Sequence, residues 1–161
     1  HVFNNVDLDM SQFEKTWEEL KRDEKGETSI TSGLKRIPNH LPALIKAEKI
    51  QHKAALIGFD WDDIKDVFEK IEEEYKELLD ECKQGNIKYI KEELGDLLFS
   101  IVNLARFLHI DSEEALNLTN QKFINRFEFM EENASKLHKK LEDLTLDQME
   151  ELWQSAKKNK L

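Results

Sequence analysis

Cysteine, proline and glycine are scarce in this sequence. Its 161 residues include one cysteine, two prolines and five glycines. The single cysteine, Cys82, excludes an internal disulfide framework and fits a reducing compartment, so we expect a cytoplasmic protein. The low proline and glycine content excludes collagen-like and low-complexity chains and favours a helical, globular protein.

Long hydrophobic runs and an excess of basic charge are missing as well. The longest apolar run, residues 97–110, is interrupted by polar residues and is shorter than the roughly 18–20 residues of a membrane span, so we expect no membrane partner. The 34 acidic residues outnumber the 24 basic ones and give a formal net charge of −10. Because this charge repels nucleic-acid phosphates, we expect no nucleic-acid partner.

The spacing of apolar residues predicts an all-α fold, a helical bundle of about six helices without strands. We expect helices over residues 11–21, 42–57, 62–84, 87–109, 110–137 and 145–158. Ser11 with Glu14, and Thr145 with Gln148, have the spacing of capping boxes. Residues 24–40 are rich in Gly, Ser and Thr, and we expect a mobile loop there.

The length fits one domain, residues 1–161, with a single core. A start without methionine suggests that the sequence is a fragment of a longer chain.

Two acidic clusters occur on consecutive predicted helices. The helix over residues 62–84 carries Glu72, Glu73, Glu74 and Glu77. On a helical wheel Glu74 borders the apolar stripe of this helix, Glu77 lies beside the stripe, and Glu73 points further toward solvent.

The next helix, residues 87–109, is apolar around most of its circumference and should be buried on most sides. Its narrow polar stripe contains Glu93, Asp96, Ser100 and Asn103. Glu93 and Asp96 are three residues apart and are neighbours on one face, where their like charges repel. Burying an ionised carboxylate without a partner is costly.

The turn at Gly85 should make the two helices antiparallel neighbours. If Glu74 and Glu77 face Glu93 and Asp96, four carboxylates converge, which requires cations. Oxygen ligands suit hard ions, so we predict Mg²⁺, with Mn²⁺ as the alternative. The first cluster alone would favour a solvated acidic face. The second cluster lies inside an apolar helix, and the two together favour a metal site.

The ordered motifs resemble a known family. E-E-x-x-E at 73–77, followed by E-x-x-D at 93–96, resembles the all-α nucleoside triphosphate pyrophosphohydrolases. The stretches LPALIKAEKIQHKAALIGFDW, EELGDLLFSIVNLARFL, NQKFINRF and MEELWQSAKK narrow the resemblance to the MazG type, and it covers nearly the whole chain. The initial HVF resembles the junction before the second, catalytic half of two-domain members.

The resemblance implies an enzyme that hydrolyses nucleoside triphosphates, both NTPs and dNTPs, between the α and β phosphates to give monophosphate and pyrophosphate. It implies metal ligands at Glu74, Glu77, Glu93 and Asp96, and a homodimer whose sites use residues of both chains. It implies substrate contacts at Lys21, Lys70, Asn103, Lys122, Arg126, Trp153 and Lys157.

Glu73 is our candidate for the catalytic base, because it lies beside the expected ligands on the same turn and could accept a proton from water. Lys122 and Arg126 are four residues apart and would form one cationic face. Taken singly, each lysine would better suit solvated surface, and Trp153 could belong to the core instead of stacking on a base.

The breadth of the apolar stripe on the 87–109 helix also predicts a homodimer, because two flanking helices would leave part of it open. A two-fold partner would complete a four-helix core. Two other functions stay open. One is a narrower dUTPase-like or phosphoribosyl-ATP pyrophosphohydrolase, which the MazG-like stretches disfavour. The other is a non-catalytic helical interaction module, which the four intact carboxylates disfavour.

Overall fold

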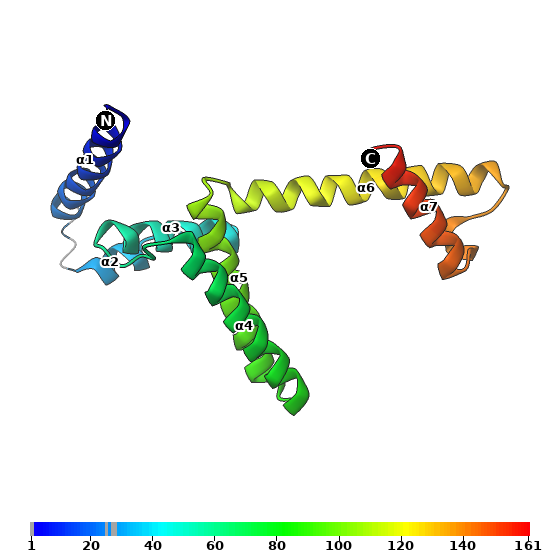
Figure 1. The fold of residues 1–161 in the computed structure, drawn as a ribbon, viewed down its shortest axis with the longest axis horizontal. Coiled ribbons are helices and arrows are strands. Elements are labelled where there is room, and N and C mark those ends of the chain that lie inside the picture. The colour runs from blue at the N-terminus through cyan, green and yellow to red at the C-terminus, as the bar shows by residue number, and fades with distance from the viewer. Residues whose placement is uncertain (1, 25, 27–28) are drawn as a thin grey trace. The chain divides into compact units, whose positions relative to one another are not determined.

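The computed structural model describes residues 2–24, 26 and 29–161. These residues form seven α-helices and one short 3-10 helix, without a strand in the described ranges (Figure 1). The all-α prediction is therefore confirmed. The chain divides into two compact units, one ending at Ser112 and one beginning at Glu113, and each is described by itself. No helix in the described residues is long and apolar enough to cross a membrane.

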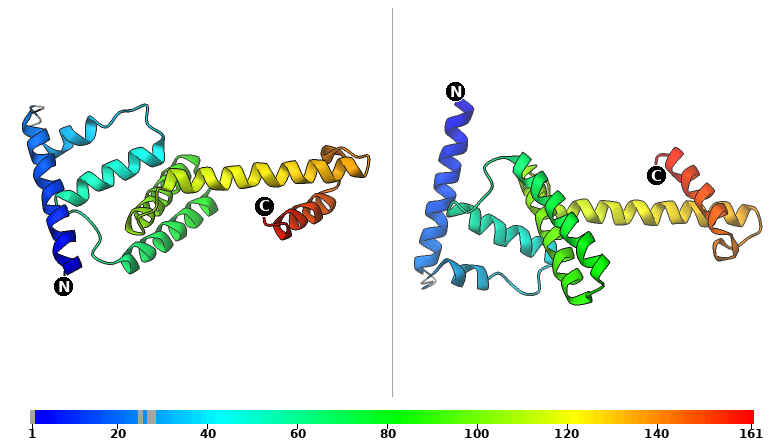
Figure 2. Two further views of the ribbon diagram at one scale, coloured as in Figure 1. Left: turned by 90° about the horizontal axis from the view of Figure 1, so that it is seen from above. Right: turned by 60° about the horizontal axis from the view of Figure 1, so that its bottom comes forward.

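The first unit contains five helices. They are α1 (Val2–Glu24), α2 (Ile30–Lys35), α3 (Ala43–Leu56), α4 (Ile64–Gln84) and α5 (Ile87–Phe107). α4 and α5 run side by side as a hairpin, while α3 packs against α5 and α1 against α3 (Figures 1 and 2). The α4–α5 hairpin is the element that positions the acidic clusters.

Local sequence explains where the hairpin begins and turns. The Asp63 carboxylate accepts the Lys65 backbone N–H at 3.0 Å and caps α4, and the Asn86 side chain accepts the Lys88 N–H at 3.1 Å and caps α5. Between them Gly85 has a φ of 77°, a left-handed conformation that ends α4 without a Cβ clash. The predicted tight turn is confirmed.

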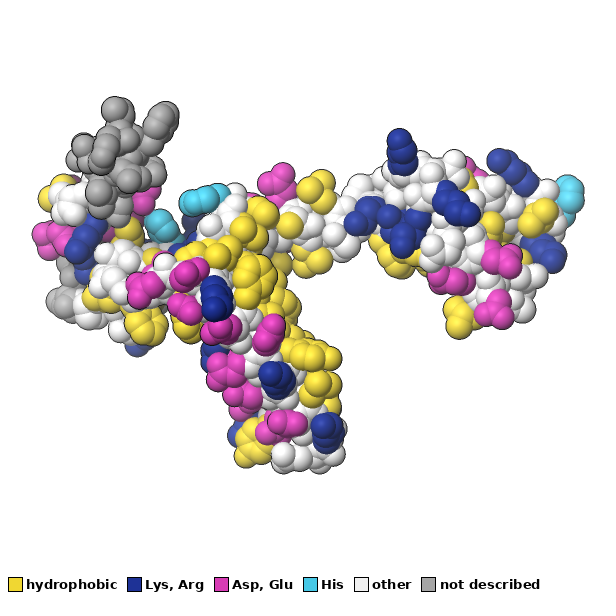
Figure 3. Space-filling model, viewed as in Figure 1, with side chains coloured by type: hydrophobic (Ala, Val, Ile, Leu, Met, Phe, Trp, Pro, Cys, Tyr) yellow, Lys and Arg dark blue, Asp and Glu magenta, His cyan; other side chains and the backbone are white. Residues whose placement is uncertain are grey.

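The buried apolar centre of the first unit is small. Among the described residues it consists of Ile37, Val67 of α4 and Val102 of α5. Large apolar residues of the same two helices stay exposed, including Phe68, Tyr75, Leu79, Leu94, Leu98 and Ile101. Figure 3 shows hydrophobic side chains gathered along one edge of this hairpin and acidic ones along the other. A single chain therefore leaves part of the α5 stripe uncovered, although Val102 on that helix is buried within the chain.

The second unit consists of α6 (Ser112–Lys136), a 3-10 helix (Leu141–Asp143) and α7 (Leu146–Lys158), which turns back alongside the end of α6 (Figure 2). Its buried apolar residues are Met130, Ala134, Leu144 and Ala156. The capping box predicted for α7 is confirmed: Thr145 Oγ1 accepts the Gln148 N–H at 3.2 Å, and the Gln148 side chain accepts the Thr145 N–H at 2.9 Å.

Two predictions for the first forty residues differ from the structure. α1 begins at Val2, so Ser11 lies inside the helix and the N-cap predicted there is wrong. The segment 24–40, predicted as a loop, contains α2, which is capped by Ser29 Oγ accepting the Ser32 N–H at 3.1 Å. Residues 25, 27 and 28 of that segment lie outside the described residues.

Candidate active site

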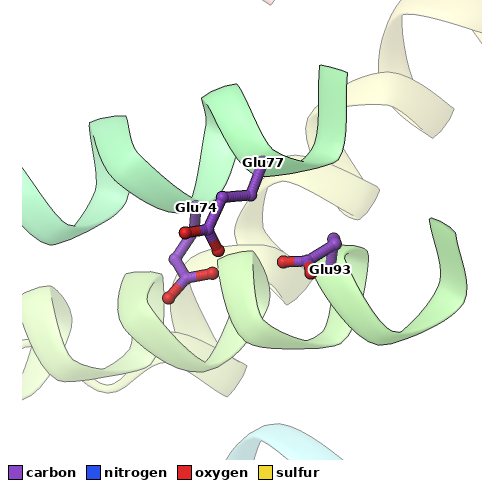
Figure 4. Close-up of side chains that lie close together, drawn as sticks. All are labelled: Glu74, Glu77 and Glu93. Carbon is purple, nitrogen blue, oxygen red and sulfur yellow. The ribbon is translucent and has the colours of Figure 1, made fainter. Parts of the chain in front are cut away.

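Three glutamates from the two helices of the hairpin converge between them. Glu74 and Glu77 of α4 and Glu93 of α5 each offer a carboxylate oxygen, and the three oxygens lie within 4.8 Å of one another (Figure 4). Glu74 is only 5% exposed. Oε2 of Glu74 and Oε2 of Glu93 are buried without a hydrogen-bond partner among the described residues.

This cluster is electrostatically unfavourable without a counter-charge. The pKa of Glu77 is raised by partial desolvation and by the negative charges of Glu74, Glu93 and Glu73. Buried carboxylate oxygens without donors have lost their solvation, and a bound cation would restore a partner to them. Carboxylate oxygens are the ligands that hard divalent cations prefer, so the residues present could hold such an ion.

Lys70 supplies part of the missing counter-charge. Its Nζ lies 2.7 Å from Glu74 Oε1, one helical turn away, and 3.3 Å from Glu73 Oε2. The hydrogen bond to Glu74 is the main reason why the pKa of Lys70 is raised, so the side chain stays cationic. Lys70 thus joins Glu73, which is half exposed, to the buried Glu74.

Asp96 lies three residues beyond Glu93 on α5, outside the cluster of three oxygens. It lines a neighbouring cavity of about 660 Å³, together with Lys70, Glu74 and Asn103. Aromatic residues contribute to the same wall: Phe59 and Trp61 from the loop between α3 and α4, and Phe99 from α5. The glutamate cluster therefore adjoins a largely apolar cavity.

Three further polar residues line this cavity, and sequence analysis did not identify them. The guanidinium of Arg106 donates to both carboxylate oxygens of Asp60, at 2.6 and 3.0 Å. Burial raises the pKa of Asp60, but the hydrogen bonds and charge of Arg106 outweigh it and hold that pKa below its usual value. Gln51 of α3 is buried and donates from Nε2 to the Phe99 carbonyl at 2.9 Å.

Lys21, another predicted substrate contact of the first unit, lies near the end of α1. Its Nζ is 3.7 Å from Glu18 and 5.6 Å from the centre of the Trp17 ring. Glu18 also pairs with Lys53 of α3 at 3.3 Å. Lys21 is therefore held at the contact between α1 and α3, and it is not among the residues that line the cavity.

The other predicted substrate contacts belong to the second unit. Arg126 of α6 lies 5.0 Å from the Trp153 ring and donates from Nε to the Leu161 carbonyl oxygen at 2.6 Å. Trp153 is half-buried, and its ring centroid is 5.3 Å from that of Phe123. Trp153 thus has a packing role inside this unit, while Lys122 and Lys157 are exposed.

Comparison with known proteins agrees with this arrangement. Residues 63–130, which include both helices of the hairpin, match the MazG nucleotide pyrophosphohydrolase domain. A protein of Thermotoga maritima named nucleoside triphosphate pyrophosphohydrolase/pyrophosphatase MazG is 47% identical over 143 residues, covering 89% of this chain. Residues 63–130 carry a MazG domain, and the similarity to the Thermotoga protein extends over most of the chain. The matched residues include the glutamate cluster, Asp96, and Asp63, which caps α4.

The MazG relatives are longer than this chain. An Escherichia coli protein named nucleoside triphosphate pyrophosphohydrolase is 38% identical over 164 residues, covering 100% of this chain but 62% of that protein. The match to the Thermotoga protein covers 54% of its length. A Bacillus subtilis protein, uncharacterized protein YabN, is 44% identical over 159 residues, 98% of this chain and 32% of that protein. The chain thus spans about half to three fifths of the first two relatives.

Proposed function

We propose that this chain is an enzyme that hydrolyses nucleoside triphosphates, NTPs or dNTPs, between the α and β phosphates to give a nucleoside monophosphate and pyrophosphate. The observation that carries the proposal is the convergence of Glu74, Glu77 and Glu93 beside an aromatic cavity. The names of the Thermotoga and Escherichia coli relatives support the same class of reaction. A cytoplasmic location accords with the single, unpaired Cys82.

The proposed cofactor is Mg²⁺, with Mn²⁺ as the alternative, held by Glu74, Glu77, Glu93 and Asp96. When bound, the ion supplies positive charge that offsets the phosphates and acidifies an attacking water. A triphosphate is strongly anionic, so a site made only of carboxylates would repel it. Dependence on a divalent cation is therefore an integral part of the proposal.

The chain's own residues have separate roles in the proposed reaction. Glu73, half exposed and held by Lys70, accepts a proton from the attacking water. The water oxygen forms a bond to the α phosphorus, and the bond from that phosphorus to the α–β bridging oxygen breaks. The electron pair of this bond leaves with pyrophosphate. Lys70 keeps a positive charge at Glu73 and Glu74 while negative charge develops on the leaving group.

The cavity is proposed to receive the nucleoside. Its volume of about 660 Å³ is within the range of ligand pockets, and Phe59, Trp61 and Phe99 give it flat apolar surfaces for a base. Asn103 lies on the polar wall of the cavity. We propose that Lys21, Lys122, Arg126 and Lys157 contribute positive charge toward the phosphates, and that Trp153 contacts the substrate.

We also propose that the active species is a homodimer formed through the apolar edge of the α4–α5 hairpin. Leu98, Ile101 and Tyr75 are each more than two fifths exposed there. An apolar surface of this kind on a helical hairpin is normally covered by another surface, and a two-fold copy would pair two hairpins into a four-helix core.

A substrate panel tests the proposed function. Pyrophosphate release should be measured from each NTP and dNTP, from dUTP and from phosphoribosyl-ATP, with Mg²⁺ and with EDTA, for the parent and for Glu93→Gln. We expect release with several nucleotides, none in EDTA, and none from the variant. Activity on dUTP or phosphoribosyl-ATP alone would favour the narrower enzymes. No release from any nucleotide would favour a non-catalytic interaction module.

A further inference from the structure

The side chain of Arg106 makes three hydrogen bonds that bind distant parts of the chain together. Nη1 and Nη2 donate to the two carboxylate oxygens of Asp60, which lies in the loop before α4. Nη2 also donates to Oδ1 of Asn103, one turn earlier on α5, at 3.0 Å. The Arg106 side chain is 15% exposed, and Asp60 is fixed in turn by accepting the Trp61 backbone N–H at 2.8 Å.

This contact determines how the Asn103 amide is oriented. A guanidinium has only donors, so the amide atom next to it must be the oxygen. The Asn103 nitrogen, with its two N–H donors, is then directed away from Arg106. Both residues line the cavity beside Glu74 and Asp96. A freely rotating asparagine would present oxygen or nitrogen to the cavity, whereas this one is held with its nitrogen available as a donor.

We propose that Arg106, clamped by Asp60, is a positioning residue that holds the Asn103 amide as a hydrogen-bond donor to an acceptor oxygen of the bound nucleotide. This inference rests on the proposed function and extends it to Arg106 and Asp60, which are neither predicted metal ligands nor predicted substrate contacts. Arg106 acts through Asn103 and does not itself touch the substrate. The arrangement favours a ligand with a phosphate, sugar or carbonyl oxygen at this point.

The Asn103→Asp variant tests the donor role of Asn103 without disturbing its packing. An aspartate at 103 still accepts the hydrogen bond from Arg106 and adds an ion pair, so folding should be unharmed. It removes the donor and places a negative charge beside an anionic ligand. We expect the unfolding temperature to stay equal or rise, KM to increase about tenfold or more, and kcat to change far less.

Arg106→Lys and the double variant show whether Arg106 acts through Asn103. Lysine keeps the charge but cannot make the forked contact to Asp60 together with the bond to Asn103. We expect Arg106→Lys to raise KM in the parent and to have little further effect in Asn103→Asp. Asn86→Asp is the matched control, because its side-chain oxygen only caps α5 and aspartate caps equally well; its KM should equal the parent's.

The outcomes separate this inference from the proposed function. The positioning role would be overturned if KM of Asn103→Asp stayed within twofold of the parent's. It would also be overturned if the two single-variant increases in KM multiplied in the double variant. Neither result would contradict the proposed hydrolytic function. If the parent does not hydrolyse nucleotides, the same variants should be compared by calorimetric binding of an α,β-methylene nucleoside triphosphate with Mg²⁺. Weaker binding by Asn103→Asp would support the inference without the enzyme, and no binding by the parent would overturn both.

Discussion

Lys70 Nζ lies 2.7 Å from Glu74 Oε1, so the most buried carboxylate of the cluster is paired with a lysine one turn before it on the same helix. The Glu74 side chain is 6% exposed and that of Lys70 is 33% exposed. The lysine partly balances the charge of Glu74, whose carboxylate also lies close to those of Glu77 and Glu93.

Lys70→Met should therefore destabilise the metal-free protein. Loss of the partner leaves a buried carboxylate unpaired, and we expect the free energy of unfolding to fall by about 1–3 kcal/mol. Denaturant unfolding in EDTA measures the change. The matched control is Lys83→Met, because Lys83 and Asp80 form a fully surface pair at 4.0 Å, and its loss should cost about 0–1 kcal/mol. Equal losses in the two variants would contradict a special role for Lys70.

The glutamate cluster should make the metal-free protein less stable as pH rises. The pKa of Glu77 is raised in the folded state, so folding favours its protonated form. Its contribution is fully present below the unfolded pKa of about 4.5 and is lost as pH rises through the higher folded pKa. Thermal unfolding of the parent in EDTA, measured from below the unfolded pKa of Glu77 to above its folded pKa, should show the unfolding temperature fall as pH rises.

Glu77→Gln should lack this pH dependence, because glutamine stays neutral, and it should be more stable than the parent in EDTA near neutral pH. Addition of Mg²⁺ should raise the unfolding temperature of the parent well above that of the variant. An unfolding temperature of Glu77→Gln that equals the parent's in EDTA would show that repulsion at this position is negligible.

Leu98→Glu should dissociate the proposed dimer. Leu98 is 47% exposed in one chain, so the charge disturbs a partner surface more than the chain's own core. Light scattering should give about twice the 19.0 kDa chain mass for the parent and about the mass of one chain for the variant. The variant should also lose hydrolysis. Leu146→Glu, at an exposed residue in the first turn of α7, is the control and should remain dimeric and active. A fully active parent monomer would contradict the proposal.

The central hairpin was predictable because its signals are local. The helices expected over 62–84 and 87–109 are observed as Ile64–Gln84 and Ile87–Phe107, since their caps and the Gly85 turn are encoded within a few residues. The convergence of Glu74, Glu77 and Glu93 follows from the same turn and from helical spacing. Helix α2 was missed because six residues are too few to show a helical period.

The cavity could not be predicted, because its walls come from residues far apart in sequence. Asp60 and Arg106 are 46 positions apart, and Gln51 and the Phe99 carbonyl 48. The packing of α3 and of the loop after it against α5 brings these residues together. The wide apolar stripe of α5 predicted a helix buried on most sides. Within the described chain Val102 is buried but Leu98 stays exposed, and periodicity alone could not tell these two parts of the stripe apart.

The position of bond cleavage tests the central claim most directly. Hydrolysis should be run in ¹⁸O-labelled water with Mg²⁺ and a nucleoside triphosphate, and the products analysed by mass spectrometry. Attack at the α phosphorus predicts one ¹⁸O in the nucleoside monophosphate and none in pyrophosphate. Label in the pyrophosphate, or release of orthophosphate and nucleoside diphosphate, would contradict the account.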